Sequence, residues 1–458
     1  MQHHREVTNF IWRVADILRG HYKQSEYGRV ILPLTVLRRL DSVMAETRDQ
    51  VAAEIERYGD QLTEVRLIGL VERTSGLGFF NRSRLDFDAL VADPDNVAQN
   101  LRSYVAGFSE NVRAIFQRFQ FDPQISKLDR SNVLFQVVRD FANIDLHQDR
   151  IDNTQMGYLY EELIRRFSEQ SNETAGEHFT PREVIRMMVA VLFEPDTDAL
   201  TARQLARTVY DPACGTGGML SVAENYATDL NPSLIFEAYG QELNPESWAT
   251  CVSDMLMKGQ EPDNIVFGNT FTHDGLPGER FHYMLCNPPF GVDWKAYRQE
   301  IEDEASQGLA GRFHAGTPRV SDGSLLFLQH MISKMRPPQE GGSRIAIVFN
   351  ASPLFTGQAG SGESEIRRWL IESDYLEAII GLPDQLFYNT GISTYVWILT
   401  NRKEERRRGK VQWASPRIVE GFLLISGFML PRFGAHLRFV SPRVPVRRRP
   451  GSSSHTSC

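Results

Sequence analysis

Four consecutive residues, Asn287-Pro288-Pro289-Phe290, follow the apolar run 281–286, where a buried strand would open into a pocket. An amino group on a heteroaromatic ring is a poor nucleophile because its lone pair is delocalised into the ring. The Asn287 side-chain oxygen and the Pro288 carbonyl can accept its two hydrogens and free that lone pair for attack. The prolines hold both acceptors rigidly, and Phe290 offers a face for an extruded base. Taken alone, Asn-Pro-Pro is equally typical of an ordinary turn.

A second strand-to-turn signal, Asp211-Pro212-Ala213-Cys214-Gly215-Thr216-Gly217-Gly218, lies upstream. Small residues let the backbone approach a ligand closely, and the helix that follows presents free N–H groups. The glycines lead to no Lys-Ser/Thr pair, and Leu220 occupies the third position of the dinucleotide spacing, so a pyrophosphate is not expected. Further along, the predicted strand 237–242 ends in Glu242, whose carboxylate can bind both hydroxyls of a ribose. The pattern predicts a nucleoside site, with a tight packing turn as the alternative.

Together these two motifs resemble those of the S-adenosylmethionine-dependent amino-group DNA methyltransferases. More narrowly, the chain resembles the modification (M) subunit of a type I restriction-modification system. A third segment, Gly176-Glu177-His178-Phe179-Thr180-Pro181-Arg182, matches the family motif that precedes the glycine loop and closes over the methionine end of the cofactor. Segments 10–28 and 34–41 also resemble that subunit, and the likeness covers roughly residues 8 to 411.

The resemblance implies an N6-adenine DNA methyltransferase that uses S-adenosyl-L-methionine and transfers the methyl group directly to a flipped adenine. Asn287, Pro288, Pro289 and Phe290 would be its catalytic residues, and no metal is implied. The cofactor-binding residues would be Glu177, His178, Phe179, Thr180, Pro181, Arg182, Asp211, Ala213, Gly215, Thr216, Gly217, Gly218, Glu242 and Asn269.

Several of these residues have specific expected roles. The loop from Gly215 to Gly218 would back the methionine part of the cofactor, and Glu242 would bind its ribose. Asn269 would lie near the adenine of the cofactor or the target base. Asp211 would orient the loop or the cofactor's amino group, and bracing of the loop is an equally good interpretation.

The expected partners are double-stranded DNA, a specificity (S) subunit, a second copy of the chain and, as a further candidate, a restriction (R) subunit. After Phe290 no block remains that would read a sequence in the major groove, so another polypeptide is expected to supply specificity. The net charge of −8 argues against strong DNA binding by this chain alone, because phosphate neutralisation drives such binding. Two alternatives stay open: a non-catalytic scaffold that clamps DNA, and a methyltransferase for another amino or amide acceptor. Cofactor binding separates the first alternative from an enzyme.

Composition is that of an ordinary globular chain: 458 residues, 41% hydrophobic and 24% charged. No apolar stretch is long enough to cross a bilayer, and the N-terminus lacks the apolar region of a signal peptide. Four cysteines show neither metal-ligand spacing nor a disulfide framework. We therefore expect a cytoplasmic protein without a membrane segment.

The predicted fold class is α/β: a Rossmann-like S-adenosylmethionine-dependent methyltransferase sheet preceded by an all-α N-terminal domain. Residues 1–150 are predicted to form the helical domain, which would contact partners and DNA, with periodic apolar runs at 29–40 and 132–142. A further helix is predicted around 158–164, and the methyltransferase domain spans 151–411. Its seven strands, in a mixed and mostly parallel sheet, are predicted near 207–211, 237–242, 264–267, 281–286, 343–350, 376–382 and 393–400.

Three segments carry further expectations. The glycine-rich stretch 308–323 is either a lid over the flipped base or a disordered surface loop. The basic run 402–410 would touch phosphates or form a solvated loop. Residues 412–458 contain seven Arg, one Glu and neither Lys nor Asp, a balance of +6. They depart from the family pattern, and we predict an atypical basic, disordered tail, altered or frame-shifted, whose loss of the usual ending bears on complex assembly more than on chemistry.

Overall fold

The computed structural model describes residues 13–170, 180–200, 205–384, 386–387 and 392–415. The chain divides into two compact units. The first unit comprises Met1–Phe179, Cys214–Gly218 and Gly240–Asn269, and the second comprises Thr180–Ala213, Met219–Tyr239 and Thr270–Cys458. The predicted boundaries at residues 150 and 411 divide the sequence differently and stay a prediction.

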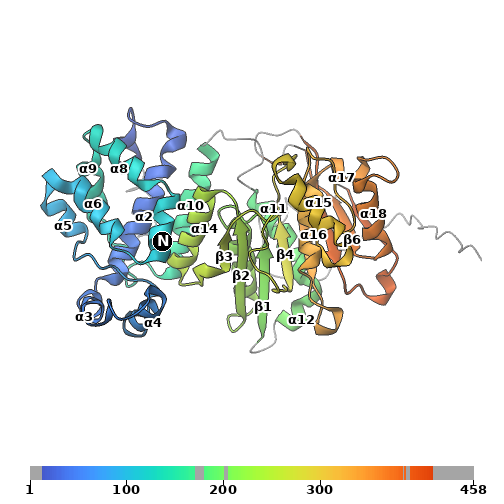
Figure 1. Ribbon diagram of the computed structural model, residues 1–458, viewed down its shortest axis with the longest axis horizontal. Coiled ribbons are helices and arrows are strands. Elements are labelled where there is room, and N and C mark those ends of the chain that lie inside the picture. The colour runs from blue at the N-terminus through green and yellow to red at the C-terminus, as the bar shows by residue number, and fades with distance from the viewer. Residues whose placement is uncertain (1–12, 171–179, 201–204, 385, 388–391, 416–458) are drawn as a thin grey trace, which may run out of the picture. The chain divides into compact units, whose positions relative to one another are not determined.

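The first unit is mainly helical. Its α9 shows why: Leu134, Val137, Val138 and Phe141 are buried, and their spacing of three and four residues puts them on one face. The helices predicted from residues 29–40, 132–142 and 158–164 correspond to α2, α9 and α10. The helices described in this unit are α2 (Gly28–Met44), α3 (Arg48–Tyr58), α4 (Glu64–Ser75), α5 (Phe87–Ala92), α6 (Val97–Ala106), α7 (Glu110–Arg118), α8 (Phe121–Arg130), α9 (Leu134–Ala142), α10 (Asn153–Gln170) and α14 (Pro245–Lys258) (Figure 1).

A buried carboxylate ties several of these helices together. Asp41 on α2 accepts hydrogen bonds from Arg38 (2.7 Å), Arg48 (2.8 Å) and the Tyr104 hydroxyl (2.7 Å). A buried charge is tolerated only when it is paired and hydrogen-bonded, and Asp41 meets both conditions. Burial and the neighbouring carboxylate raise the pKa of Tyr104 well above its usual value, so the phenol stays a donor. This network gives the helical part of the first unit its polar core.

The first unit also contains the later segment Gly240–Asn269, which includes helix α14. This helix packs against α7 and α10. The guanidinium of Arg118, at the end of α7, lies 4.4 Å from the ring centroids of both Trp248 on α14 and Phe267 on β3. Such stacking of Arg between aromatic faces is favourable. The segment that contains Glu242 and Asn269 is therefore held by the N-terminal helices.

One sheet runs through the described residues, with the strand order β3-β2-β1-β4-β5-β7-β6-β8. Strand β7 is antiparallel to β5 and β6, and the registered pairs β2/β3, β1/β4, β4/β5 and β6/β8 are parallel. All seven predicted strands are present, so the predicted fold class is confirmed. The strands are β1 (Ala206–Asp211), β2 (Ile235–Glu242), β3 (Ile265–Phe267), β4 (Tyr283–Cys286), β5 (Arg344–Asn350), β6 (Leu376–Gly381), β7 (Thr394–Thr400) and β8 (Gln412–Ala414).

Strand β8 was not predicted. It comprises only Gln412–Ala414 and pairs with β6 at the edge of the sheet. Three residues are too few to show an alternating pattern, so backbone pairing with β6 decides their conformation. The predicted disordered tail therefore begins too early at residue 412, and residues 416–458 lie outside the described part of the chain.

Both faces of the second unit's sheet are covered by helices. Successive residues of a strand point to opposite faces, so Tyr283 and Met284 on β4 face different layers. Phe193, at the end of α11, packs on Tyr283 with ring centroids 4.5 Å apart. Met284 belongs to the main core cluster, to which α16 contributes Leu325 and Met331 among others. The helices described in this unit are α11 (Arg182–Phe193), α12 (Thr197–Leu200), α13 (Gly218–Leu230), α15 (Arg298–Ser306), α16 (Ser324–Ser333), α17 (Ser352–Phe355) and α18 (Gly362–Glu372).

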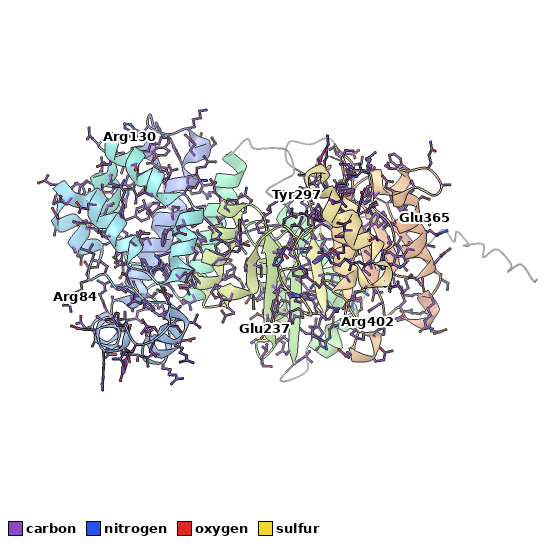
Figure 2. The ribbon with its side chains drawn as sticks, in the orientation of Figure 1. Arg84, Arg130, Glu237, Tyr297, Glu365 and Arg402 are labelled. Carbon is purple, nitrogen blue, oxygen red and sulfur yellow. The ribbon has the colours of Figure 1, made fainter. Side chains whose placement is uncertain are left out.

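The basic run 402–410 neither forms a free phosphate-binding strip nor a fully solvated loop. Arg402, labelled in Figure 2, donates to both carboxylate oxygens of Asp196, with Nη1–Oδ1 at 2.7 Å. Lys403 pairs with Asp374 at 2.5 Å, and Arg407 pairs with Glu377 at 2.5 Å. Each acidic partner lies 29 residues or more before its own cation, so no local pattern in the sequence reveals these pairs. These cations instead anchor the chain after β7. No helix in the described residues is long and apolar enough to span a membrane.

Candidate active site

The Asn287-Pro288-Pro289-Phe290 motif begins where β4 ends. All four residues of β4 are buried, and the prolines that follow cannot donate to a strand ladder, so pairing stops at Cys286. The Asn287 side-chain nitrogen donates to the Thr180 hydroxyl at 2.9 Å. The other end of the amide, Oδ1, is buried and has no hydrogen-bond partner among the described residues. An unpaired buried acceptor costs about 1–3 kcal/mol, so this oxygen is a candidate group for binding a ligand.

Phe290 is half-buried and meets a second aromatic ring. Its centroid lies 6.2 Å from that of Phe387, with the planes at 68°. This edge-to-face arrangement fixes the orientation of the Phe290 ring. Phe387 is buried and follows β6 in the chain, 97 residues after Phe290, and the motif itself gave no sign of this contact.

At the end of β1, Asp211 braces the turn. Its Oδ1 accepts the backbone N–H of Ala213 at 3.0 Å, an Asx-type turn. The Thr270 hydroxyl donates to the Pro212 carbonyl at 2.6 Å and holds the same turn from a second direction. The bracing interpretation of Asp211 is therefore what the geometry shows, and a cofactor contact by this carboxylate stays a prediction.

The glycine loop in the first unit has the backbone that its sequence suggested. Gly215 and Gly217 have φ of +56° and +85°, in the region that favours glycine. A Cβ on Gly217 would lie 2.8 Å from the Cys251 sulfur, whereas a Cβ on Gly215 would meet no atom within 4 Å. One side of the loop is therefore packed against α14, and at Gly215 the backbone borders open space.

Glu242 holds the loop from the end of β2. Its Oε2 accepts the Gly215 N–H at 2.8 Å, and its Oε1 accepts the Asn244 N–H at 2.6 Å. The Gly268 N–H donates to the Glu242 carbonyl at 2.9 Å, which brings the residue before Asn269 to the same strand end. The first unit thus gathers Gly215, Glu242 and the Gly268-Asn269 turn, as the sequence motifs suggested. Support of the loop by the Glu242 side chain was not foreseen.

The predicted site residues fall in both units and partly outside the described chain. Glu177, His178 and Phe179 lie outside the described residues. Pro181 is buried, and Arg182 begins α11. The first unit contains Gly215, Thr216, Gly217, Gly218, Glu242 and Asn269, and the second contains Thr180, Pro181, Arg182, Asp211, Ala213, Asn287, Pro288, Pro289 and Phe290.

Arg312 is an important residue that no sequence motif indicates. Its guanidinium donates to the Thr270 carbonyl (2.7 Å) and the Phe271 carbonyl (2.9 Å), and it forms a two-pronged pair with Glu304 (2.7 Å for each bond). The stretch 308–323 is therefore anchored around Arg312, contrary to the disordered-loop alternative, and the lid alternative stays a prediction. Thr270 lies 42 residues before Arg312, so the local sequence gives no sign of this contact.

Arg312 also determines the tautomer and the protonation state of His330. Its Nη1 lies 3.0 Å from His330 Nδ1, and His330 Nε2 lies 2.9 Å from the Tyr210 hydroxyl. An arginine can only donate, so Nδ1 accepts and Nε2 carries the proton. Burial and then the Arg312 charge lower the pKa of His330 well below its usual value. This histidine is a neutral structural link between β1 and α16, not a proton-transfer group.

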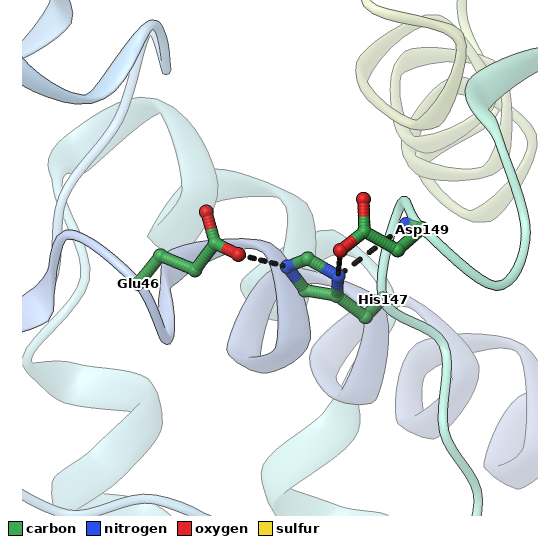
Figure 3. Close-up of side chains that lie close together, drawn as sticks. All are labelled: Glu46, His147 and Asp149. Carbon is green, nitrogen blue, oxygen red and sulfur yellow. Dashed lines mark hydrogen bonds and ion pairs between the residues drawn. The ribbon is translucent and has the colours of Figure 1, made fainter.

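One cluster in the described residues combines a histidine with carboxylates, at Glu46, His147 and Asp149 (Figure 3). Glu46 lies 3.6 Å from His147 Nε2, whereas Asp149 lies 3.5 Å from Nδ1. One ligand atom from each side chain lies within 4.8 Å of the others, but each carboxylate faces a different ring nitrogen, and such exposed groups are common without an ion. The geometry fits surface ion pairing.

The fold defines a class of protein. It is similar to that of the methyltransferase subunit of a type I restriction-modification system from Streptococcus thermophilus, with a TM-score of 0.69, 23% identity and 93% of each chain covered. The model of the N-6 DNA methylase family matches residues 151–417, and that of the HsdM N-terminal domain matches residues 7–141. The chain belongs to the N-6 DNA methylase family.

The names of similar proteins are consistent with membership of this family. The chain is 24% identical over 424 residues to the type I restriction enzyme MjaIX methylase subunit of Methanocaldococcus jannaschii, covering 89% of this chain and 71% of the relative. It is 29% identical over 264 residues to the HindI methylase subunit of Haemophilus influenzae, covering 57% and 54%. The chain thus spans about half the length of the second relative. The predicted resemblance is confirmed at the level of the family, whose two models together cover most of the chain.

Proposed function

We propose that this chain is the catalytic subunit of a type I restriction-modification complex and methylates N6 of an adenine flipped out of double-stranded DNA. The observation that carries the proposal is the Asn287 amide, whose nitrogen is held by Thr180 and whose buried oxygen has no partner among the described residues. An acceptor kept in this way suits an amino group that must donate both of its hydrogens. A hydroxyl nucleophile has only one hydrogen to donate, and a carbon nucleophile has none.

The chain's own residues would act through hydrogen bonding and position. Asn287 Oδ1 and the Pro288 carbonyl would accept the two N6 hydrogens, which favours a tetrahedral nitrogen with an available lone pair. Phe290, oriented by Phe387, would stack on the base. The proton can leave to solvent after attack, so no strong base is required. Positioning would supply most of the rate, since no covalent enzyme intermediate forms.

The residues present fit the methyl donor. Gly215 offers backbone that borders open space, and Glu242 supplies a carboxylate suited to ribose hydroxyls at the same loop. The remaining proposed contacts are Glu177 to Arg182, Asp211, Ala213, Thr216 to Gly218 and Asn269. When bound, S-adenosylmethionine supplies a methyl group on a positively charged sulfur.

The proposed partners are double-stranded DNA, a specificity subunit, a second copy of the chain and a restriction subunit, in the cytoplasm. A net charge of −8 argues against strong DNA binding by this chain alone, and a partner subunit would supply the missing affinity. The names of the relatives, methylase subunits of type I restriction enzymes, support this assignment.

The test uses labelled S-adenosylmethionine and genomic DNA, with and without the neighbouring specificity subunit, followed by digestion to nucleosides. Label in N6-methyladenine that requires the partner and is lost in Asn287→Ala supports the proposal. Cofactor binding with no label in DNA, even with the partner present, would favour another acceptor. Absence of cofactor binding would favour a non-catalytic DNA clamp.

A further inference from the structure

One hydrogen bond joins two motifs that the sequence separates by 107 residues. The Thr180 hydroxyl accepts a hydrogen from the Asn287 side-chain nitrogen at 2.9 Å. Thr180 stands in the segment expected to close over the cofactor, and no sequence pattern connects it to the catalytic motif. Both residues belong to the second unit, so the contact lies inside one compact body.

The elements that carry the two residues are packed against each other. Pro181 restricts Thr180 to extended conformations, and α11 begins directly afterwards at Arg182. Helix α11 packs on β4 and β5. Phe193, the last residue of α11, meets Tyr283, the first residue of β4, with ring centroids 4.5 Å apart. The helix therefore runs back along β4, and its start lies at the strand end where Asn287 follows.

The contact matters because the two ends of an amide are not equivalent. Oxygen accepts two hydrogen bonds, whereas nitrogen carries two hydrogens and would oppose the hydrogens of a substrate amino group. If the Asn287 amide turned over, the Thr180 hydroxyl could donate to its oxygen. Two N–H donors would then occupy the buried position where Oδ1 now has no partner among the described residues. Two unpaired donors cost more than one unpaired acceptor, so the observed orientation is favoured.

We propose that Thr180 is a positioning residue whose hydroxyl holds the Asn287 amide with Oδ1, not Nδ2, towards the target amino group. The inference rests on the proposed function and deepens it. Thr180 would touch neither the methyl group nor the acceptor nitrogen. It would act through Asn287, and its loss would lower turnover more than cofactor affinity.

The test compares Thr180→Val, which keeps the shape and removes the hydroxyl, with Thr180→Ser, which keeps the hydroxyl. The matched control is Thr394→Val, because the Thr394 hydroxyl is buried and has no partner among the described residues. Single-turnover methyl transfer is measured in the complex with the specificity subunit at saturating cofactor, and the Kd of S-adenosylmethionine is measured by calorimetry. Thr180→Val should lower the transfer rate by roughly 10- to 100-fold with Kd changed by less than about 3-fold, as expected for loss of an interaction used in the transition state. Thr180→Ser and Thr394→Val should stay within about 3-fold of the wild type.

A second readout does not depend on the acceptor. In protein labelled with ¹⁵N at asparagine, the Asn287 side-chain amide, assigned with Asn287→Asp, should exchange its hydrogens faster in Thr180→Val and not in Thr394→Val. Unchanged exchange in Thr180→Val would overturn the inference, as would weaker cofactor binding with normal turnover at saturation. An equal loss of rate in Thr180→Ser would also overturn it. If the wild-type complex leaves DNA adenine unmodified, the proposed function fails, and the amide exchange still decides whether Thr180 holds Asn287.

Discussion

Replacement of Arg312 by Met should unfold the second unit more easily and loosen the turn beside the proposed cofactor site. The Arg312 side chain is 12% exposed, and its Glu304 partner is 22% exposed. Met fills a similar volume but donates nothing to Glu304, Thr270 or Phe271. Removing one partner of a largely buried ion pair costs about 3–5 kcal/mol, because the other charge is left unpaired. We expect a loss of about 3–4 kcal/mol, at the lower part of that range, since water reaches Glu304 in part.

The assay is urea unfolding followed by tryptophan fluorescence, together with calorimetric binding of S-adenosylmethionine. The matched control is the double variant Arg312→Met with Glu304→Leu, which removes the stranded charge and should recover about half of the loss, because an apolar pair often replaces a buried ion pair at little cost. Cofactor binding should stay weaker in both variants, since neither restores the bonds to the Thr270 and Phe271 carbonyls. A single variant within about 1 kcal/mol of the wild type would refute the reasoning.

The same pair predicts a pH dependence. Burial alone would raise the pKa of Glu304, but the Arg312 hydrogen bonds outweigh it, so the pKa lies below its usual value. A lowered folded-state pKa contributes stability that is present above the unfolded pKa of about 4.3 and is lost as the pH falls through the folded value. The stability difference between wild type and Arg312→Met should therefore shrink on acidification below that pH. A difference that stays constant from pH 7 to pH 3 would contradict this assignment.

Three further predictions follow from other contacts. Asn287→Ala should abolish methyl transfer, by at least about 100-fold, with near-normal S-adenosylmethionine affinity, because only the acceptor is removed; loss of cofactor binding in calorimetry would count against its role. Gly217→Ala should cost about 2–4 kcal/mol and weaken cofactor binding, since φ is +85° and the new Cβ would lie 2.8 Å from the Cys251 sulfur. Adding Cys251→Ala should restore part of that stability, and no recovery would exclude the steric explanation. Arg402→Met should cost about 2–3 kcal/mol at pH 7 in urea unfolding. Burial raises the pKa of Asp196, but bonds from Arg402 and Tyr283 lower it overall, so this cost should fall in acid.

Several features of the fold followed from local sequence. Seven of the eight described strands were predicted, because most of them are apolar-rich runs bounded by Gly, Pro or polar residues, and the periodic run 132–142 identified α9 by its spacing. The motif at Asn287 could be interpreted because the chemistry of an amide followed by two prolines depends on adjacent residues. Strand β8 was not predicted, because an edge strand of three residues is defined by its pairing with β6 and not by its own sequence pattern.

The contacts that complete the site come from residues far apart in the chain. Nothing near Thr180 in the sequence points to Asn287, and nothing near Arg312 points to Thr270 or His330. Such pairs form only when the packing of helices and strands brings their terminal residues together, and that packing is determined by the whole core. For the same reason, three cations of the basic run at 402–410, which suggested phosphate binding, are already paired. They form ion pairs with the carboxylates of Asp196, Asp374 and Glu377.

The sequence by itself therefore determined the family, the positions of seven strands along the chain and the chemical character of the motifs, because these depend on residue type and short spacing. Only the tertiary structure decided which end of the Asn287 amide is held, what supports the glycine loop and whether a charged side chain is available to a ligand. Each of these is a matter of distance between residues that the chain separates and the fold brings together.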